Sequence, residues 1–187
     1  MSSKSDFIRK VLETYLCQML TLGIGVFSVI FFSKILGPTA RGVLATAMAT
    51  ITLGVQFGNI GLHASNTYFI AKDRTLVQVA VANTSVIAVV LGTLIAVVIW
   101  MGSLVDSTWL PVNGRVLLLT VFLIPFALAY LLFQNILLGL QQIRIYNTVE
   151  MIRFVVFIFI CSLFVFGIRN VEIILVAHFI SLFLVLY

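Results

Sequence analysis

The sequence predicts an all-α protein, a polytopic bundle of about six transmembrane helices in a single domain. Hydrophobic residues make up 62% of the 187 positions and charged residues only 9%, which is more apolar surface than a soluble domain of this size can bury. The charges are also clustered, and a membrane span needs about 20 consecutive apolar residues. Six runs meet or approach that length, at residues 14–36, 42–66, 76–101, 116–140, 149–168 and 171–187.

A short polar turn joins the first two runs and should fold them into an antiparallel hairpin. It reads Leu36, Gly37, Pro38, Thr39, Ala40, Arg41 and Gly42. The first run itself has small and polar residues at helical spacing, at Gln18, Thr21, Gly25 and Ser28. These residues either line a polar path or pack against the glycines of the second run.

The second run is expected to form a helix with two unlike faces. Polar residues recur every three or four positions along one face, at Thr52, Gln56, Asn59, His63 and Asn66. Glycines recur on the opposite face, at Gly54, Gly58 and Gly61, where they should let another helix pack closely. A single polar residue in a membrane helix often bonds to a neighbouring helix, whereas a stripe this continuous favours a hydrated cleft lined by Gln56, Asn59 and His63.

Two later features could also act in transport. Pro125 lies about a third of the way along the fourth run, where it should kink the helix or free a backbone carbonyl. Arg153 lies about one turn into the fifth run, three residues after Glu150. It could pair with Glu150, extend to the inner membrane surface, or point inward. In the last case its guanidinium would be the best candidate in the chain for holding a phosphate.

The basic residues favour a cytoplasmic N-terminus through the positive-inside rule. That orientation places seven Lys and Arg residues inside, at Lys4, Arg9, Lys10, Lys72, Arg74, Arg144 and Arg153. It leaves four outside, at Lys34, Arg41, Arg115 and Arg169. The sixth run stays apolar to its last residue, whereas a chain terminus normally emerges into the polar phase. We therefore expect an N-terminal portion of a longer protein or a truncated product.

Catalytic and metal-dependent chemistry find little support in the sequence. The two histidines, His63 and His178, lack the spacing to acidic residues that zinc hydrolases need, and no nucleotide-binding or nucleophile motif is present. We expect no enzyme, catalytic residue, metal or cofactor, and no nucleic-acid partner, because the basic residues are spread over loops. All six carboxylates fall in loops or near the ends of runs, whereas proton-coupled pumps often keep one deep in the membrane.

Three segments carry a resemblance to a known family. They are Ser33 to Pro38 followed by Arg41 and Gly42, then Gly58 to Leu62, and finally Gln134 to Gln141 followed by Tyr146 and Asn147. Together they resemble the N-terminal half of bacterial polysaccharide-biosynthesis membrane proteins, over most of residues 10–150. These are Wzx-type oligosaccharide flippases of the multidrug/oligosaccharidyl-lipid/polysaccharide exporter superfamily.

The resemblance implies one lobe of a two-lobed transporter in the bacterial cytoplasmic membrane. Such proteins move undecaprenyl-pyrophosphate-linked oligosaccharides to the outer leaflet by alternating access, during surface polysaccharide biosynthesis. The partners would be the second lobe or another copy, the lipid-linked glycan, and the polymerase and glycosyltransferases of the same pathway. The turn at Gly37, Pro38, Arg41 and Gly42 would be a family motif. The substrate path would be lined by Gln56, Asn59 and His63, with Gln18 and Arg153.

Two other functions stay open at this point. The first is a small-molecule exporter of the same superfamily. Its members often carry an acidic residue in the first helix, whereas the middle of the first run, Gly23 to Ser28, has none, which favours the lipid-glycan branch. The second is a membrane scaffold that is complete at six helices and transports nothing.

Overall fold

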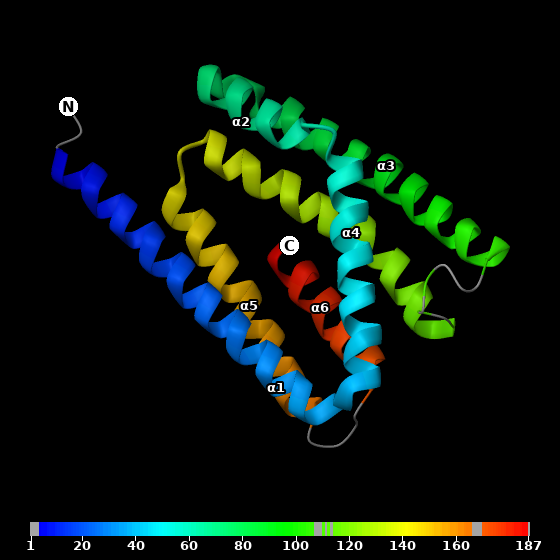
Figure 1. Cartoon of the computed structure of the whole chain (residues 1–187). Coiled ribbons are helices and arrows are strands. Elements are labelled where there is room, and N and C mark those ends of the chain that lie inside the picture. Colours follow the sequence, from blue (N-terminus) through cyan, green and yellow to red (C-terminus); the bar gives the residue numbers. More distant parts are fainter. Residues whose placement is uncertain (1–3, 107–109, 111, 113, 166–169, 187) are drawn as a thin grey trace.

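The computed structural model of the chain describes residues 4–106, 110, 112, 114–165 and 170–186. All regular structure among these residues is helical, which confirms the predicted all-α class. A short 3-10 turn, η1 (Arg74–Leu76), precedes the third α-helix. The α-helices are α1 (Lys4–Asn59), α2 (Leu62–Lys72), α3 (Val77–Val105), α4 (Gly114–Gly139), α5 (Ile143–Val165) and α6 (Val171–Leu186) (Figure 1).

α1 contains the first predicted run and most of the second, and it bends sharply between them. Gly37 has φ 77° and ψ 173°, a backbone conformation that is essentially restricted to glycine. Pro38 follows and has no N–H with which to continue the hydrogen bonding of the preceding turn. The helix therefore forms a V whose first limb is residues 4–36 and whose second limb is residues 38–59 (Figure 1).

The second predicted run, residues 42–66, is not one continuous helix. α1 ends at Asn59 and α2 begins at Leu62, with φ values of 42° at Ile60 and 78° at Gly61 between them. Two successive residues in the left-handed region cannot continue a right-handed helix. The expectation of a single polar stripe over residues 52–66 is therefore wrong, because His63 lies on a helix that leaves α1 in a new direction (Figure 1).

α4 is the central helix of the bundle. It packs against every other α-helix, most extensively against α3, and its side chains Leu123, Ile124, Leu128 and Leu132 are almost fully buried. A helix that is apolar on all sides is stable only when other helices or lipid cover it. The remaining helices are arranged around α4 and leave most of their outer surfaces exposed.

Four helices are long and apolar enough to cross a membrane in the described part of the chain, at Val11–Asn59, Arg74–Val105, Gly114–Gly139 and Ile143–Leu163. The first of these bends, so its two limbs can each cross a membrane: residues 4–36 extend about 50 Å and residues 38–59 about 33 Å. α6 is shorter, with 16 residues. The last residues of the predicted fifth run and Arg169 lie outside the described residues. The chain is therefore a multi-pass helical protein suited to a membrane.

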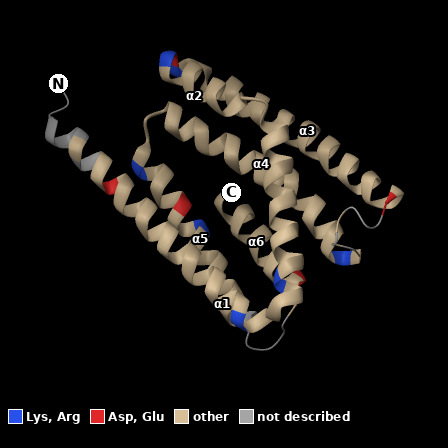
Figure 2. Ribbon diagram, viewed as in Figure 1, with Lys and Arg blue, Asp and Glu red and all other residues tan. Residues whose placement is uncertain are grey.

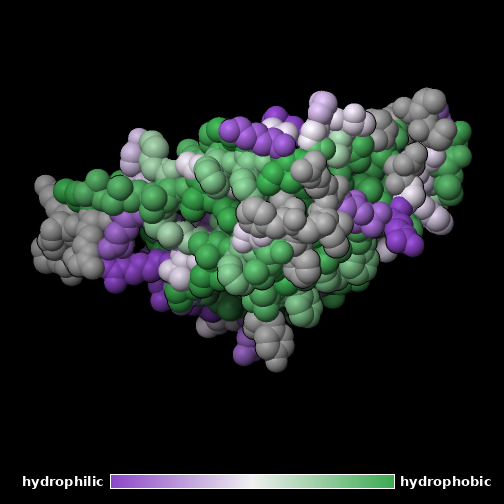
Figure 3. Space-filling model, turned by 90° about the horizontal axis from the view of Figure 1, so that it is seen from below, coloured by the Kyte–Doolittle hydropathy of each residue, from purple (hydrophilic) through white to green (hydrophobic). Residues whose placement is uncertain are grey.

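The charged residues lie mainly where helices begin, end or bend (Figure 2). Apolar surface covers most of the face seen in Figure 3, and the hydrophilic residues on it form small separate groups. This is the distribution expected of helices whose middle parts contact lipid and whose ends contact water. Glu13, within α1, and Glu150 and Arg153, within α5, are exceptions.

Candidate functional site

Four polar side chains form a cluster that joins α4 to α5 inside the apolar bundle. The Glu150 carboxylate accepts hydrogen bonds from the Tyr130 hydroxyl, from Gln134 Nε2 at 3.1 Å and from Arg153 Nη2 at 2.9 Å. Gln134 Nε2 also donates to the Tyr130 hydroxyl. Each group in this network orients another. We call Tyr130, Gln134, Glu150 and Arg153 the Glu150 cluster.

Arg153 is held within the bundle rather than extended to the membrane surface. Its side chain is only 14% exposed. The guanidinium carbon lies 5.0 Å from the centre of the Tyr130 ring and 4.5 Å from that of Phe154, both within the range of cation–π attraction. Among the described residues, its Nε is buried and has no hydrogen-bond partner. Of the three arrangements considered for Arg153, pairing with Glu150 is the one observed.

Glu150 does not lie near the end of its helix, which corrects the expectation from the sequence. α5 begins at Ile143, whereas the predicted run begins at residue 149. Glu150 is seven residues beyond Ile143, or about 10 Å along the axis. Residues 143–148 are polar enough to be taken for a loop in the sequence, but the chain turns at Gln141 (φ 59°) and the helix starts immediately afterwards.

Stability alone does not explain the charge pair. Removing two opposite charges from water costs about as much as their attraction returns, and an apolar pair is often at least as stable. Ionisable side chains inside membrane helices usually mark substrate or ion pathways. The Glu150 cluster is therefore the strongest candidate site among the described residues.

A small polar pocket lies beside this cluster, between the first limb of α1 and α5. Its volume is about 270 Å³. It is lined by Cys17, Gln18, Thr21, Leu22, Tyr146, Asn147 and Glu150. We call it the α1–α5 pocket. It brings Gln18, one of the predicted pathway residues, to the same site as the ion-pair partner of Arg153.

The three pathway residues predicted on the second run lie elsewhere. Gln56 is exposed on the second limb of α1. The amide of Asn59 contacts His63 Nδ1 at 2.6 Å, and its Oδ1 accepts a hydrogen bond from the His63 backbone N–H at 3.1 Å. Asn59 is buried and links α1 to α2 through these bonds. Asn59 and His63 are thus brought together, whereas Gln56, about one turn earlier on α1, is exposed.

The three glycines of the second run have two different roles. A Cβ on Gly54 would lie 3.0 Å from Ile124 Cδ1, and one on Gly58 would lie 2.8 Å from Leu128 Cδ2. Both glycines therefore permit a close approach of α1 to α4. A Cβ on Gly61 would have no described atom within 4 Å. The expected packing role of Gly61 is wrong, because its positive φ forms the turn between α1 and α2 instead.

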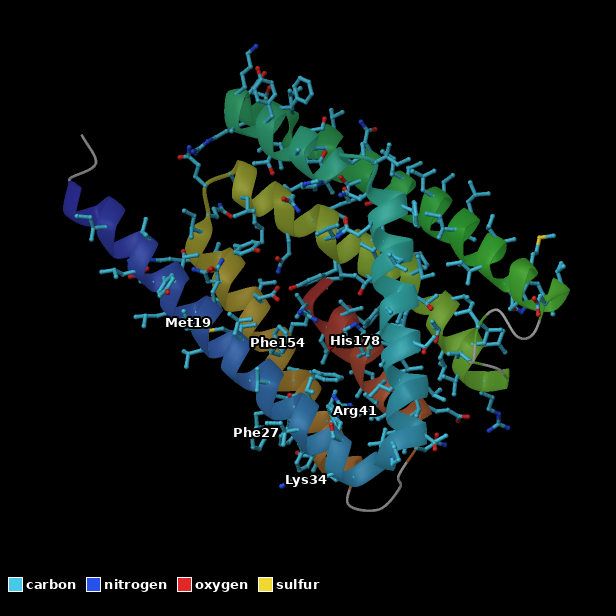
Figure 4. The ribbon with its side chains drawn as sticks, viewed as in Figure 1. Met19, Phe27, Lys34, Arg41, Phe154 and His178 are labelled. Carbon is cyan, nitrogen blue, oxygen red and sulfur yellow. The ribbon has the colours of Figure 1, made fainter. Side chains whose placement is uncertain are left out.

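The turn expected as a family motif forms the bend of α1. Gly37 and Pro38 supply its backbone conformation. Arg41 and Gly42 are exposed just after the bend, and Lys34 lies just before it (Figure 4). This places basic side chains at the end of the bundle where the two limbs meet.

Sequence reasoning missed two members of the Glu150 cluster. Tyr130 and Gln134 are four residues apart, the spacing that puts two side chains on one face of a helix. That spacing inside an otherwise apolar run was an available signal. Their partner on α5 was not predictable in the same way, because contact between the two helices depends on the turn that joins them.

Another groove on the described part of the molecule is mostly apolar. It has a volume of about 980 Å³ and lies between α3, α4 and α6, where Phe122, Pro125 and Phe126 contribute to its lining. Its lining includes the hydroxyls of Ser85 and Thr93 and the indole of Trp100, but none of the amides or carboxylates that line the α1–α5 pocket. In the part of the chain that the structure describes, no group of three or more His, Cys, Asp or Glu side chains is placed to hold a metal ion.

Comparison with known proteins returned no match. No family model, no curated protein and no solved structure is similar to this chain at a significant level.

Proposed function

We propose that this chain is one lobe of a flippase in the bacterial cytoplasmic membrane, moving undecaprenyl-pyrophosphate-linked oligosaccharide to the outer leaflet during surface polysaccharide biosynthesis. The observation that carries the proposal is the Glu150 cluster, which lies next to the polar α1–α5 pocket among helices that are otherwise apolar. The sequence resemblance described above names the substrate class. Transport is by alternating access, with a second lobe or another copy completing the cavity.

The physical requirements of such a substrate agree with this site. A sugar-pyrophosphate head cannot enter hydrocarbon without hydrogen-bonding partners, whereas the polyprenyl tail of the same lipid is apolar and stays in the bilayer. A transporter for such a lipid needs polar groups that are reached sideways from the bilayer. The exposed Gln18 provides such access at the edge of the α1–α5 pocket.

The decisive experiment removes both charges of the cluster at once. Glu150→Gln combined with Arg153→Gln leaves no unpaired buried charge and keeps hydrogen-bonding side chains in place. In the host cell, surface polysaccharide should fall at least about tenfold, because charge-assisted hydrogen bonds contribute ~1.5–3 kcal/mol each. Lipid-linked glycan should accumulate in the inner leaflet. Arg74→Gln, which removes an exposed cation at the α2–α3 connection, is the control. Normal export by the double variant at normal protein levels would refute the proposal.

The predicted pathway residues on the second run are tested separately. Gln56→Leu is the cleanest change, because Gln56 is exposed, whereas Asn59 and His63 bond to one another. If the second limb lines the substrate path, this variant should lower export without lowering the amount of protein in the membrane. If export is unchanged, Gln56 does not line the substrate path. The triple change of Gln56, Asn59 and His63 to leucine then tests whether Asn59 and His63 line it.

One observation favours a second candidate, a small-molecule exporter of the same superfamily. Glu150 lies within an apolar helix rather than in a loop, and carboxylates inside membrane helices can take part in proton coupling. In that case Glu150→Gln should abolish resistance to exported compounds and leave surface polysaccharide unchanged. Measuring both phenotypes in one strain separates the two functions.

A further inference from the structure

The first limb of α1 and α5 run parallel and side by side, with a register that changes by only three residues over the contacts described. Arg144 Nε pairs with Glu13 Oε2 at 3.2 Å, Asn147 Nδ2 donates to Thr14 Oγ1 at 3.2 Å, and the sulfur atoms of Cys17 and Met151 lie 3.6 Å apart. These pairs are separated by 131, 133 and 134 residues along the chain. Because the offset is nearly constant, distances along one helix can be compared with distances along the other.

The shared register gives the depth of the α1–α5 pocket. The exposed ion pair of Glu13 and Arg144 marks the polar end of this helix pair. Gln18 lies five residues beyond Glu13 and Glu150 six residues beyond Arg144, or about 8 Å and about 9 Å along the two axes. Both distances therefore place the pocket at the same depth, just below the level of the Glu13–Arg144 ion pair. A lipid headgroup could reach this level while its hydrocarbon chain stays in the bilayer.

The lining of the pocket suits hydroxyl groups better than ions. Amides, a hydroxyl, a phenol and a carboxylate provide both donors and acceptors, from Gln18, Asn147, Thr21, Tyr146 and Glu150. The negative charge of Glu150 is already paired with Arg153, and its oxygens accept three hydrogen bonds from the cluster. A cation would have to compete with the guanidinium, and an anion would approach the carboxylate. An uncharged ligand meets neither obstacle.

We propose that the α1–α5 pocket binds a single uncharged sugar ring. The volume of about 270 Å³ has room for one ring and not for an oligosaccharide. The ring's hydroxyl groups bond to Gln18, Thr21 and Glu150, and the Tyr146 ring offers an apolar surface to its C–H groups. This inference rests on the proposed function, because it takes the ring to be part of the lipid-linked glycan. The Glu150 cluster then holds the carboxylate in position for the sugar.

The test is equilibrium binding of methyl glycosides to the purified chain. The chain is placed in lipid nanodiscs, without sugar-based detergents that would occupy the pocket. Methyl glycosides of glucose, galactose and N-acetylglucosamine are titrated by saturation-transfer NMR, with methyl glucuronide and glucosamine as the charged comparisons. We expect saturable binding of at least one uncharged ring and weaker binding of both charged ones.

Two pocket variants and one matched control make the result specific. Gln18→Leu and Thr21→Val should each weaken binding about fivefold, the effect expected for one uncharged hydrogen bond. Gln78→Leu makes the same change at an exposed glutamine on α3, outside the pocket, and should have no effect. Thr21→Val keeps the shape of the side chain, so lost binding cannot be ascribed to misfolding.

The outcomes distinguish the pocket from the flippase. Absence of saturable binding, tighter binding of a charged probe, or binding unchanged by both pocket variants would overturn the sugar site. If sugar binding behaves as expected while the Glu150→Gln/Arg153→Gln variant still exports polysaccharide normally, the sugar site stands and the proposed function fails. If export depends on the cluster while the pocket variants bind sugar normally, the proposed function stands and the sugar site fails.

Discussion

The crossing of α3 and α4 depends on a glycine that tolerates no side chain. A Cβ added to Gly92 would lie 2.5 Å from Pro125 Cα, 2.7 Å from its Cβ and 3.2 Å from its nitrogen. Two of these three atoms belong to the backbone, so no rotation of a side chain can relieve the overlap. Gly92→Ala must therefore push α3 and α4 apart, and theirs is the most extensive helix–helix interface of the described bundle.

The size of the effect follows from the geometry. Restoring an ordinary contact distance requires a separation of about 1 Å, and overpacking of a close contact costs ~1–3 kcal/mol. The upper end applies here because backbone atoms are involved. Alanine recovers about 1 kcal/mol of helix propensity relative to glycine. We expect a net loss of about 2 kcal/mol in the free energy of unfolding.

A series of glycine-to-alanine variants provides the control. A Cβ on Gly23 would have no described atom within 4 Å, so Gly23→Ala should be neutral or stabilising by up to about 1 kcal/mol. In Gly58→Ala the added Cβ would contact the rotatable end of the Leu128 side chain, so the loss of stability should lie between those of Gly92→Ala and Gly23→Ala. The assay is unfolding in mixed micelles by titration with sodium dodecyl sulfate, followed by circular dichroism. If Gly92→Ala and Gly23→Ala unfold at the same detergent fraction, the reasoning is refuted.

Three further predictions concern other parts of the chain. Glu150→Leu should lower the free energy of unfolding by about 3 kcal/mol because it leaves Arg153 unpaired, and adding Arg153→Leu should restore most of it. Gly61→Ala should cost about 1 kcal/mol, because alanine disfavours its φ of 78°. The pKa of Asp73 is held below its ordinary value by hydrogen bonds from the Thr75 hydroxyl and backbone N–H. Thr75→Val should raise that pKa toward its ordinary value, as measured by NMR titration.

Each of these has a result that would contradict it. For the ion pair, a double variant no more stable than Glu150→Leu alone would mean that the carboxylate matters for its own hydrogen bonds. For Gly61, stability equal to that of Gly23→Ala would show that the turn relaxes without strain. The Asp73 interaction stabilises the fold fully above the unfolded pKa of this carboxyl and is lost as the pH falls through the lower folded pKa. If the pKa of Asp73 is unchanged in Thr75→Val, the Thr75 hydroxyl does not contribute to this stabilisation.

The membrane-suited helical class could be predicted because it depends on composition and on the lengths of apolar runs. The bend at Gly37 and Pro38 could be predicted for a similar reason, since both residues restrict the backbone locally. The close approaches at Gly54 and Gly58 followed from their helical spacing. The break at Ile60 and Gly61 was missed, because a glycine at helical spacing is as compatible with packing as with a turn.

Local chemistry in the chain determined which segments are helical, where polar residues interrupt them and where the first helix must bend. Tertiary structure decided which of those polar residues meet. Tyr130 and Gln134 reach Glu150 only because the turn at Gln141 lays α5 against α4. Gln18 joins the same site only because the first limb of α1 runs in register with α5. Helix formation depends on neighbours in sequence, whereas the candidate site depends on the packing of helices that no local pattern specifies.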